Sequence, residues 1–266
     1  MITCEILGHG ADNNGLGNQM FCIATALGLA YDNDDTATFP ELMYPPYDFY
    51  GRTIFHKLTK LPINVTEVYH EPAYSSTIYK QIPYKQNMSM RGHFQSYKYF
   101  ESSQDKIIEL FELPRHMSSS IEKKYKHILD NAFDKVSIHI RRGDYLKLQG
   151  HYASLDLEYY QNALDMINKD QIVLFSDDIA WCKENIYFKN KQVEFIEGEM
   201  DIVDMHLMSK IPSNIIANST FSWWAAFLNK NKDKKIIGPS QWFGPKRSKC
   251  NETETKDLFP PDWIRI

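Results

Sequence analysis

The sequence has few cysteines, and none of them lies in a pattern that binds zinc. The four cysteines, Cys4, Cys22, Cys182 and Cys250, are far apart and form no C-x-x-C pair. This argues against a zinc site and indicates free thiols in a reducing compartment. The first ten residues lack the charged and apolar regions of a secretion signal, and no run of 18 apolar residues occurs. We therefore expect a cytoplasmic protein with no transmembrane segment.

Neither sign of charge dominates the chain. There are 30 lysines and arginines against 34 aspartates and glutamates, so the net charge is −4. A general nucleic-acid binder would show a basic face, so no nucleic-acid partner is expected. Hydrophobic residues make up 43% of the 266 residues, which is enough for a packed core in one large or two modest domains. An anionic ligand would have to be met by a local cluster of cations.

The second half of the chain alternates predicted strands and helices. Repeated β-α units of this kind indicate a parallel sheet with right-handed crossovers. We place a domain boundary near residue 133, giving domains 1–133 and 134–266. The expected strands are 136–140, 171–175, 193–197, 214–218 and 234–238, and the expected helices between them are 155–168, 177–186, 200–211 and 219–231.

The first half is less regular. A short strand at 2–7 leads into a glycine-rich loop, 8–19, and then into a helix at 20–32, where apolar residues recur at helical spacing. The loop matches neither the P-loop nor the G-x-G-x-x-G fingerprint, and a turn with no ligand is an open alternative. Residues 36–100 are rich in proline and tyrosine and predict loops and short strands, the last being a strand and turn at 91–100. Two helices are expected next, one ended by Pro114 and one started by a serine cap.

Two adjacent arginines follow the first strand of the second half. Residues 136–140 alternate apolar and polar as a half-buried strand does, and Arg141 and Arg142 come directly after them. Ligands of α/β proteins bind at the carboxyl ends of the strands, and two guanidiniums there suit a diphosphate. Two other interpretations stay open. The arginines could pair with carboxylates in a solvated turn, or the embedded RGD could be an adhesion tripeptide.

Polar residues also follow two other strands. Asp177 and Asp178 end one, and Asn218, Ser219 and Thr220 end another and begin the helix that holds Ser222. Hydroxyl groups at a helix start can bind phosphate, but they can equally cap the helix, and the aspartates can do the same. The D-x-D sequence at 32–34 lies at the end of a predicted helix and is interpreted as a solvated turn. We therefore expect arginine, rather than a metal ion, to neutralise the charge.

Five stretches then point to one family. HIRRGDY (139–145) resembles the H-x-R-R-G-D-Y motif of the bacterial-type α-1,2-fucosyltransferases, glycosyltransferase family 11, and four further stretches agree in the family's order: GLGNQMF (15–21), GHFQSYKYF (92–100), FSDDIAWCKEN (175–185) and DMHLMSKIPSNIIANSTFSWWAAFLN (204–229). The resemblance implies an α/β fold of the GT-B-like kind, with two Rossmann-like domains facing a central cleft. It implies that the second domain binds GDP-fucose and that the first shapes the acceptor side.

The resemblance also implies roles for individual residues. The expected reaction transfers L-fucose from GDP-β-L-fucose, with inversion, to O2 of a terminal β-galactoside, without a metal or another cofactor. Arg142, helped by Arg141, would stabilise the negative charge that develops on the leaving diphosphate. His139 and Asp204 match positions that contact guanine in related fucosyltransferases. The other expected donor-binding residues are Asp177, Asn218, Ser219, Thr220, Ser222, Gly15, Gly17, Asn18 and Gln19.

The general base is not assigned by the sequence. Some distant fucosyltransferases have a glutamate seven residues after the second arginine, where this chain has Gln149. Asp144, His151 and Asp156 are therefore the candidates, and a dissociative path that needs only a weak base is the alternative. A GDP-sugar transferase of another linkage, or a catalytically silent nucleotide-sugar or glycan-binding protein, would share these motifs. The acceptor glycan, the oligomeric state and peripheral membrane contact stay open.

Overall fold

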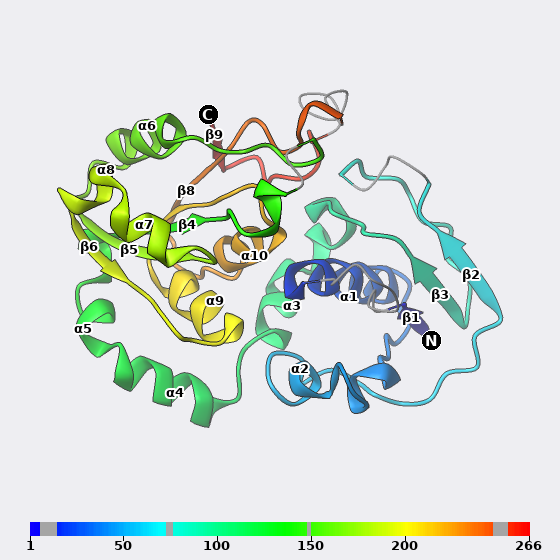
Figure 1. Cartoon of the computed structure of the whole chain (residues 1–266). Coiled ribbons are helices and arrows are strands. Elements are labelled where there is room, and N and C mark those ends of the chain that lie inside the picture. The colour runs from blue at the N-terminus through cyan, green and yellow to red at the C-terminus, as the bar shows by residue number, and fades with distance from the viewer. Residues whose placement is uncertain (6–14, 73–76, 148–149, 247–254) are drawn as a thin grey trace. The chain divides into compact units, whose positions relative to one another are not determined.

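The computed structural model describes residues 1–5, 15–72, 77–147, 150–246 and 255–266 (Figure 1). The chain divides into two compact units. Unit 1 comprises Met1–Met117 and Glu254–Pro260, and unit 2 comprises Ser118–Thr253 and Pro261–Ile266. The chain thus leaves unit 1 once and returns to it briefly near the C-terminus.

Unit 1 is built on a small parallel sheet in the order β1-β3-β2, in which Ile2 and Glu67 both pair with Met88. The buried helix α1 packs against β1 and β3. Much of the remaining chain is irregular or forms short 3-10 turns, as the proline- and tyrosine-rich composition predicted. The elements are β1 (Ile2–Cys4), α1 (Leu16–Tyr31), α2 (Asp48–Arg52), β2 (Glu67–His70), β3 (Met88–Arg91) and α3 (Gln104–Leu110).

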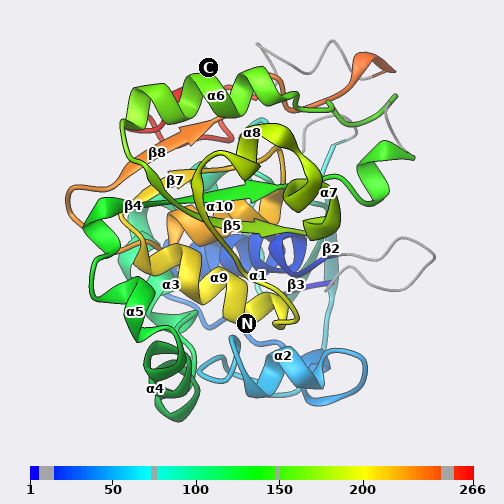
Figure 2. The ribbon, with the colours of Figure 1, turned by 60° about the vertical axis from the view of Figure 1, so that its left-hand side comes forward.

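Unit 2 is a doubly wound α/β structure around a six-stranded parallel sheet in the order β6-β5-β4-β7-β8-β9. Helices α6, α7 and α8 lie on one side of this sheet and α9 and α10 on the other (Figures 1 and 2). The elements are α4 (Arg115–Lys124, which begins in unit 1), α5 (Lys126–Leu129), β4 (Lys135–Ile140), α6 (Leu157–Ile167), β5 (Gln171–Ser176), α7 (Ile179–Glu184), α8 (Ile186–Lys189), β6 (Gln192–Phe195), α9 (Asp201–Lys210), β7 (Ser213–Ile215), α10 (Thr220–Phe227), β8 (Lys235–Gly238) and β9 (Ile264–Arg265).

The sequence predicted this alternation of strands and helices. One helix start was wrong: α4 begins at Arg115, directly after Pro114, and not at a serine cap among residues 118–120. Pro114 accepts the first turn's bond from the Met117 amide at 2.8 Å. A proline at a helix start loses no hydrogen bond and has a φ that suits the helix, which explains why the helix begins there.

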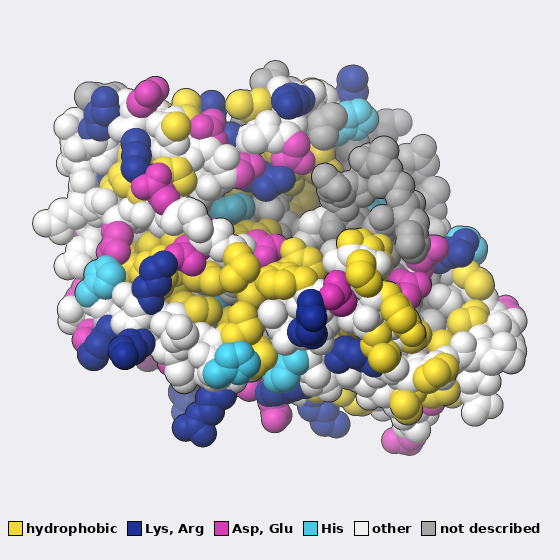
Figure 3. Space-filling view, turned by 60° about the horizontal axis from the view of Figure 1, so that its bottom comes forward, with side chains coloured by type: hydrophobic (Ala, Val, Ile, Leu, Met, Phe, Trp, Pro, Cys, Tyr) yellow, Lys and Arg dark blue, Asp and Glu magenta, His cyan; other side chains and the backbone are white. Residues whose placement is uncertain are grey.

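The described cysteines Cys4, Cys22 and Cys182 are free and buried. Within the described ranges, no helix combines the length and the apolar character needed to cross a bilayer. On the face shown in Figure 3, lysine and arginine side chains are scattered among acidic ones. This mixed pattern agrees with the small net charge of −4.

Candidate functional site

The strand order of unit 2 defines where a ligand would bind. Numbered within the unit, the order β6-β5-β4-β7-β8-β9 corresponds to 3-2-1-4-5-6, the order of a dinucleotide-binding sheet. The chain after β4 runs to one side of the sheet and the chain after β7 runs to the other. In sheets of this kind a crevice forms outside the carboxyl ends of the two strands where the order reverses. Ile138 pairs with Ile215, so the residues after β4 and β7 leave the sheet side by side.

Strand β4 is the central strand and is buried along its whole length. The expectation of a half-buried strand was therefore wrong. Helices cover both faces of a parallel sheet, so its polar positions are enclosed too. Ser137 is fully buried and accepts a hydrogen bond from the Asn214 amide on β7. His139 is only 5% exposed.

Carboxylates at the end of β5 hold Arg142 in place. Its backbone N–H donates to Asp177 Oδ1 at 2.9 Å, and its Nε donates to Asp178 Oδ2 at 3.0 Å. The guanidinium carbon lies 3.7 Å from the centre of the Trp181 ring, a cation–π contact. These contacts use Nε and one face of the guanidinium. Within the described residues they leave its two terminal nitrogens without a protein partner, so these can bind an anion.

The Arg141 guanidinium contacts more carboxylates than the Arg142 guanidinium does. One terminal nitrogen donates to Asp144 Oδ1 at 2.7 Å, and the other lies 3.1 Å from Asp177 Oδ2. The interpretation that the arginines pair with nearby carboxylates is therefore correct for both side chains. It does not exclude anion binding, because Arg142 keeps unused donors while Arg141 has committed both of its terminal nitrogens.

Gly143 and Tyr145 fix the turn that follows the arginines. A Cβ atom at Gly143 would lie 2.6 Å from Asp177 Oδ2, so only glycine lets the turn approach that carboxylate so closely. The Tyr145 hydroxyl donates to the Asn218 carbonyl at 3.0 Å, and its ring stacks on Tyr152 at 4.1 Å. The turn after β4 is thus tied to the end of β7, next to the start of α10.

Four polar residues lie at the start of α10, and their side chains make different contacts: Asn218, Ser219, Thr220 and Ser222. The Asn218 amide donates to two backbone carbonyls, and the buried Ser222 hydroxyl donates to the Ala217 and Ser219 carbonyls. These two side chains stabilise the local backbone. Ser219 is the N-cap residue but makes no side-chain capping bond, and Thr220 is the first residue of the helix. The ordinary capping role is therefore absent at Ser219.

His139 faces the helix layer of α10. Its ring lies 5.4 Å from that of Phe221, and its Nδ1 is buried and has no hydrogen-bond partner among the described residues. Burial, with a smaller contribution from Arg141, lowers the pKa of His139 from 6.5 to about 3. The imidazole is therefore neutral at pH 7 and has an unused polar nitrogen.

Asp204 lies on α9, which packs against α10. Its Oδ1 is buried, and no group in the part of the chain that the structure describes donates a hydrogen bond to it. Burial raises the pKa of Asp204 from 3.8 to about 7, with smaller contributions from Glu199 and Asp201. An unpaired buried carboxylate oxygen is costly unless a donor reaches it, which is typical of a residue that binds a ligand.

The candidate bases have unequal surroundings. The Asp156 carboxylate caps α6 by accepting from the Tyr159 amide at 3.0 Å, and that of Asp144 binds Arg141. The His151 side chain is exposed and makes no hydrogen bond or ion pair with the residues that the structure describes. The His151 backbone carbonyl accepts from the Gly244 amide. Gln149 lies outside the described residues.

In unit 1, the segment expected to be a glycine loop is largely helical where it is described. Helix α1 begins at Leu16, with Gly15 as its N-cap residue, so Gly17, Asn18 and Gln19 lie in its first turn. The helix start predicted at residue 20 was therefore late. The Gln95 amide donates to Asn18 Oδ1 at 2.9 Å.

Two contributors to the site were given no role from the sequence. Trp181 supports the Arg142 guanidinium, and Tyr145 joins the ends of β4 and β7. Asp178 was expected at a strand end as a candidate helix cap, and it both caps α7 and binds Arg142. Among the described residues, no three His, Cys, Asp or Glu side chains are grouped so as to hold a metal ion.

Comparison with known proteins assigns this arrangement to a family. The model of the family described as "Glycosyl transferase family 11" matches residues 11–266. An α-1,2-colitosyltransferase of Escherichia coli is 31% identical over 95% of this chain and 96% of its own length. The O-antigen biosynthesis glycosyltransferase WbnK of Escherichia coli is 33% identical over 68% of this chain but only 62% of its own length. Galactoside α-(1,2)-fucosyltransferase 2 of Pongo pygmaeus is 28% identical over 80% of this chain and 66% of its own.

Two solved structures share the fold. The fucosyltransferase NodZ from Bradyrhizobium superposes with a TM-score of 0.57 at 12% identity, over 85% of this chain and 93% of its own. POFUT1 in complex with GDP-fucose superposes with a TM-score of 0.50 at 12% identity, over 89% and 96%. Both have the GT-B fold, and the α/β architecture of this chain is therefore GT-B-like, as the sequence predicted.

Proposed function

The chain belongs to glycosyl transferase family 11, and on that premise we propose that it is a galactoside α-1,2-fucosyltransferase. It would transfer L-fucose from GDP-β-L-fucose to O2 of a terminal β-galactoside with inversion. The observation that carries the proposal is Arg142, which follows β4 at the point where the strand order reverses and whose two terminal nitrogens have no partner among the described residues. The α-1,2 linkage printed for the bacterial and mammalian relatives supports it.

Arg142 would act on the leaving group. As the glycosidic bond breaks, negative charge grows on the β-phosphate, and a fixed guanidinium stabilises that charge without reorganising. Asp177, Asp178 and Trp181 hold Arg142 before the substrate arrives. Arg141, which is paired with Asp144 and Asp177, would help Arg142 by fixing the turn after β4. Ser219 and Thr220 at the start of α10 would bind the same diphosphate with the helix N-terminus. No step in this scheme requires a metal ion.

Asp204 and His139 would recognise the base. Guanine presents N1–H and N2–H₂ as neighbouring donors, which suit the unpaired carboxylate oxygen of Asp204. The neutral His139 imidazole offers one further hydrogen-bonding nitrogen. The solved structures of NodZ with GDP and of POFUT1 with GDP-fucose support a GDP-linked donor. Gly15, Gly17, Asn18 and Gln19 are proposed as further donor contacts, from unit 1.

The acceptor hydroxyl must lose a proton during transfer. His151 and Asp144 are the proposed bases, His151 because its exposed imidazole is uncommitted and Asp144 because it follows the arginines directly. Asp156 is the weaker candidate, since its carboxylate caps α6.

A second candidate function is transfer of colitose, the 3-deoxy form of fucose, in the same linkage. The relative that is matched over 96% of its length is an α-1,2-colitosyltransferase, which favours this alternative. The two donors differ by one hydroxyl group, so the family motifs serve both.

The test is transfer from GDP-fucose and from GDP-colitose to lactose and N-acetyllactosamine, measured with EDTA and without it. We expect a product that carries fucose on galactose O2, formed at the same rate with and without EDTA. A product from GDP-colitose alone would replace the proposed donor. GDP binding without transfer or donor hydrolysis would indicate a silent binding protein. The cytoplasmic location stays a prediction.

A further inference from the structure

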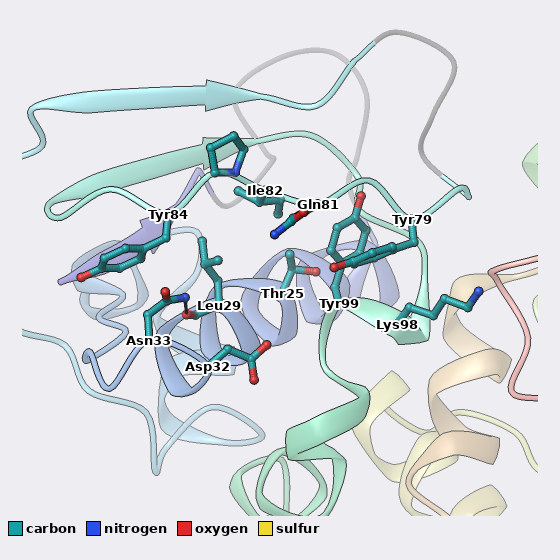
Figure 4. Close-up of a pocket in the computed structure, with 11 residues that line it drawn as sticks. Thr25, Leu29, Asp32, Asn33, Tyr79, Gln81, Ile82, Tyr84, Lys98 and Tyr99 are labelled. Atoms are coloured by element: carbon teal, nitrogen blue, oxygen red, sulfur yellow. Dashed lines mark hydrogen bonds between the residues drawn. The ribbon is translucent and has the colours of Figure 1, made fainter.

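Unit 1 contains a pocket that the proposed reaction does not use. It lies along the outer side of α1 and has a volume of about 300 Å³. That is near the lower end for small-molecule sites. Figure 4 shows Thr25 and Leu29 on α1 below Gln81 and Ile82, with Tyr79 and Tyr99 at one end and Tyr84 and Asn33 at the other.

The pocket contains a buried polar group with no partner. Thr25 is 1% exposed, and its hydroxyl makes no hydrogen bond within the described ranges, although a threonine in a helix can donate to the preceding turn. In Figure 4 this hydroxyl lies in the middle of the lining residues. An unsatisfied buried hydroxyl costs free energy, which a ligand hydroxyl entering the pocket would recover.

The rim combines aromatic rings with hydrogen-bond acceptors. Tyr79 and Tyr84 are 39% and 38% exposed, so their rings are available for contact. Asp32 accepts a bond from Ser102 through Oδ1, which leaves Oδ2 for another donor, and the Asn33 amide nitrogen is committed to the Leu29 carbonyl, which leaves its oxygen. Ring faces beside carboxylate and amide oxygens suit a sugar, whose C–H groups pack on rings while its hydroxyls donate.

The charges argue against an anionic ligand. Lys98 lies at one end of the pocket, but its Nζ is 2.6 Å from Asp257 Oδ1 and its charge is therefore neutralised. The adjacent Asp32 adds negative charge. A phosphate or nucleotide would be repelled here, whereas a neutral polyhydroxylated ligand would be accepted.

The backbone holds this geometry firmly. A Cβ atom at Gly28 would lie 2.2 Å from the Tyr99 carbonyl, so glycine lets the segment that carries Tyr99 lie directly on α1. The Tyr99 hydroxyl accepts from the Lys80 amide, and Asp257 accepts from the Tyr79 amide. The backbone at Tyr79 and Lys80 is therefore fixed by hydrogen bonds to Asp257 and Tyr99.

We propose that this pocket binds the sugar residues of the acceptor that lie beyond the reacting galactose, and so selects among galactose-terminated glycans. Thr25 is seven residues after Asn18 on α1, which is about 10 Å along the helix axis. An oligosaccharide that reaches the predicted donor contacts at the start of α1 can span that distance. The inference rests on the proposed function for the identity of the acceptor.

The first measurement is equilibrium binding of two neutral probes, methyl β-galactoside and a tetrasaccharide with a terminal β-galactose, to the protein without donor. Wild-type protein should bind the tetrasaccharide more tightly. Tyr79→Ala and Thr25→Val should each weaken tetrasaccharide binding by roughly two- to tenfold, as expected for one ring contact or one hydrogen bond. Neither should alter methyl β-galactoside binding. Tyr44→Ala is the matched control, because Tyr44 is 63% exposed on the same unit and does not line the pocket.

The outcomes separate this inference from the proposed function. Equal tetrasaccharide affinity for wild-type protein and both pocket variants would overturn the pocket, whatever the enzyme activity. Tetrasaccharide binding that is no tighter than methyl β-galactoside binding would overturn it too. Failure of wild-type protein to transfer fucose would overturn the proposed function, while the binding result would still decide the pocket. GDP titration of each variant checks that the fold is intact, and GDP affinity should be unchanged.

Discussion

The candidate polar residues of the two units lie on different kinds of backbone structure. Unit 2 has a six-stranded parallel sheet, and its candidate residues follow the strand ends or lie on helices packed against it. Unit 1 has three short strands, and its pocket is lined by one helix and by irregular segments rich in tyrosine. If unit 2 binds the donor as proposed, a regular sheet would fix the position of a diphosphate and a base that do not vary. Irregular segments can change with less effect on the core, which suits the recognition of varied acceptors.

If this division is correct, the largest effect should come from Arg142. Arg142→Ala should abolish transfer and weaken GDP binding ~10- to 150-fold, because losing a charged hydrogen bond costs about 1.5–3 kcal/mol. GDP titration by calorimetry and the transfer assay measure both. Arg142→Lys should bind GDP at intermediate strength, since it keeps the charge without the planar fork.

Arg52→Ala is the matched control, because Arg52 is 75% exposed on unit 1 and pairs only with Asp48. It should leave GDP affinity unchanged. Wild-type turnover in Arg142→Ala would remove the arginine from the mechanism, and would also remove the main reason for placing donor chemistry in unit 2.

Asp204 should give the next largest effect and a pH dependence. Its pKa is raised to about 7 in the free protein, and guanine donors favour its ionised form. GDP binding should therefore weaken roughly tenfold between pH 8 and pH 6 as the carboxyl group becomes protonated. Asp204→Asn should bind GDP weakly at both pH values. A wild-type affinity for GDP that does not change between these pH values would argue against Asp204 as the guanine ligand.

The raised pKa of Asp204 also predicts how the stability of the ligand-free protein depends on pH. The pKa of Asp204 is higher in the folded protein than its ordinary value of 3.8, so the folded state binds more protons between about pH 4 and pH 7. Its contribution to stability is therefore present at low pH and is lost as pH rises through about 7. Asp204→Asn should raise the Tm of the ligand-free protein at pH 8 and change it little at pH 4.

Asn18 tests whether unit 2 alone binds the donor, because the donor contact proposed for Asn18 lies in unit 1. If Asn18 touches GDP-fucose, Asn18→Ala should raise the donor KM about two- to twelvefold, as expected for a neutral hydrogen bond of about 0.5–1.5 kcal/mol. The KM for methyl β-galactoside should stay the same. A donor KM equal to that of the wild type would restrict donor binding to unit 2.

The smallest effect is expected at Asp156. Asp156→Ala should lower stability by about 0.5–2 kcal/mol, seen as a lower Tm, because the N-cap of α6 is lost. Asp156→Asn keeps a capping oxygen and should retain both stability and transfer. Loss of transfer in Asp156→Asn with an unchanged Tm would instead identify Asp156 as the base.

The sequence by itself determined most of the local structure of unit 2. Apolar runs separated by amphipathic segments predicted its parallel strands and its main helices, because burial on both faces of a sheet requires that pattern. It also placed Arg141 and Arg142 at a strand end and, through five motifs, indicated the family.

The contacts that those residues make depend on the tertiary structure. Asp177 and Asp178 are 35 or more positions after Arg142, yet they fix it, since β5 is the neighbour of β4 in the sheet. The pairing of strands is set by the packing of the whole core, and no local pattern encodes it. The turn at 32–34 is exposed as the sequence predicted, and its residues Asp32 and Asn33 also line a pocket beside residues 79–84, which the sequence did not show. Periodicity reports which face of an element is buried, whereas the partners on that face come from distant parts of the chain.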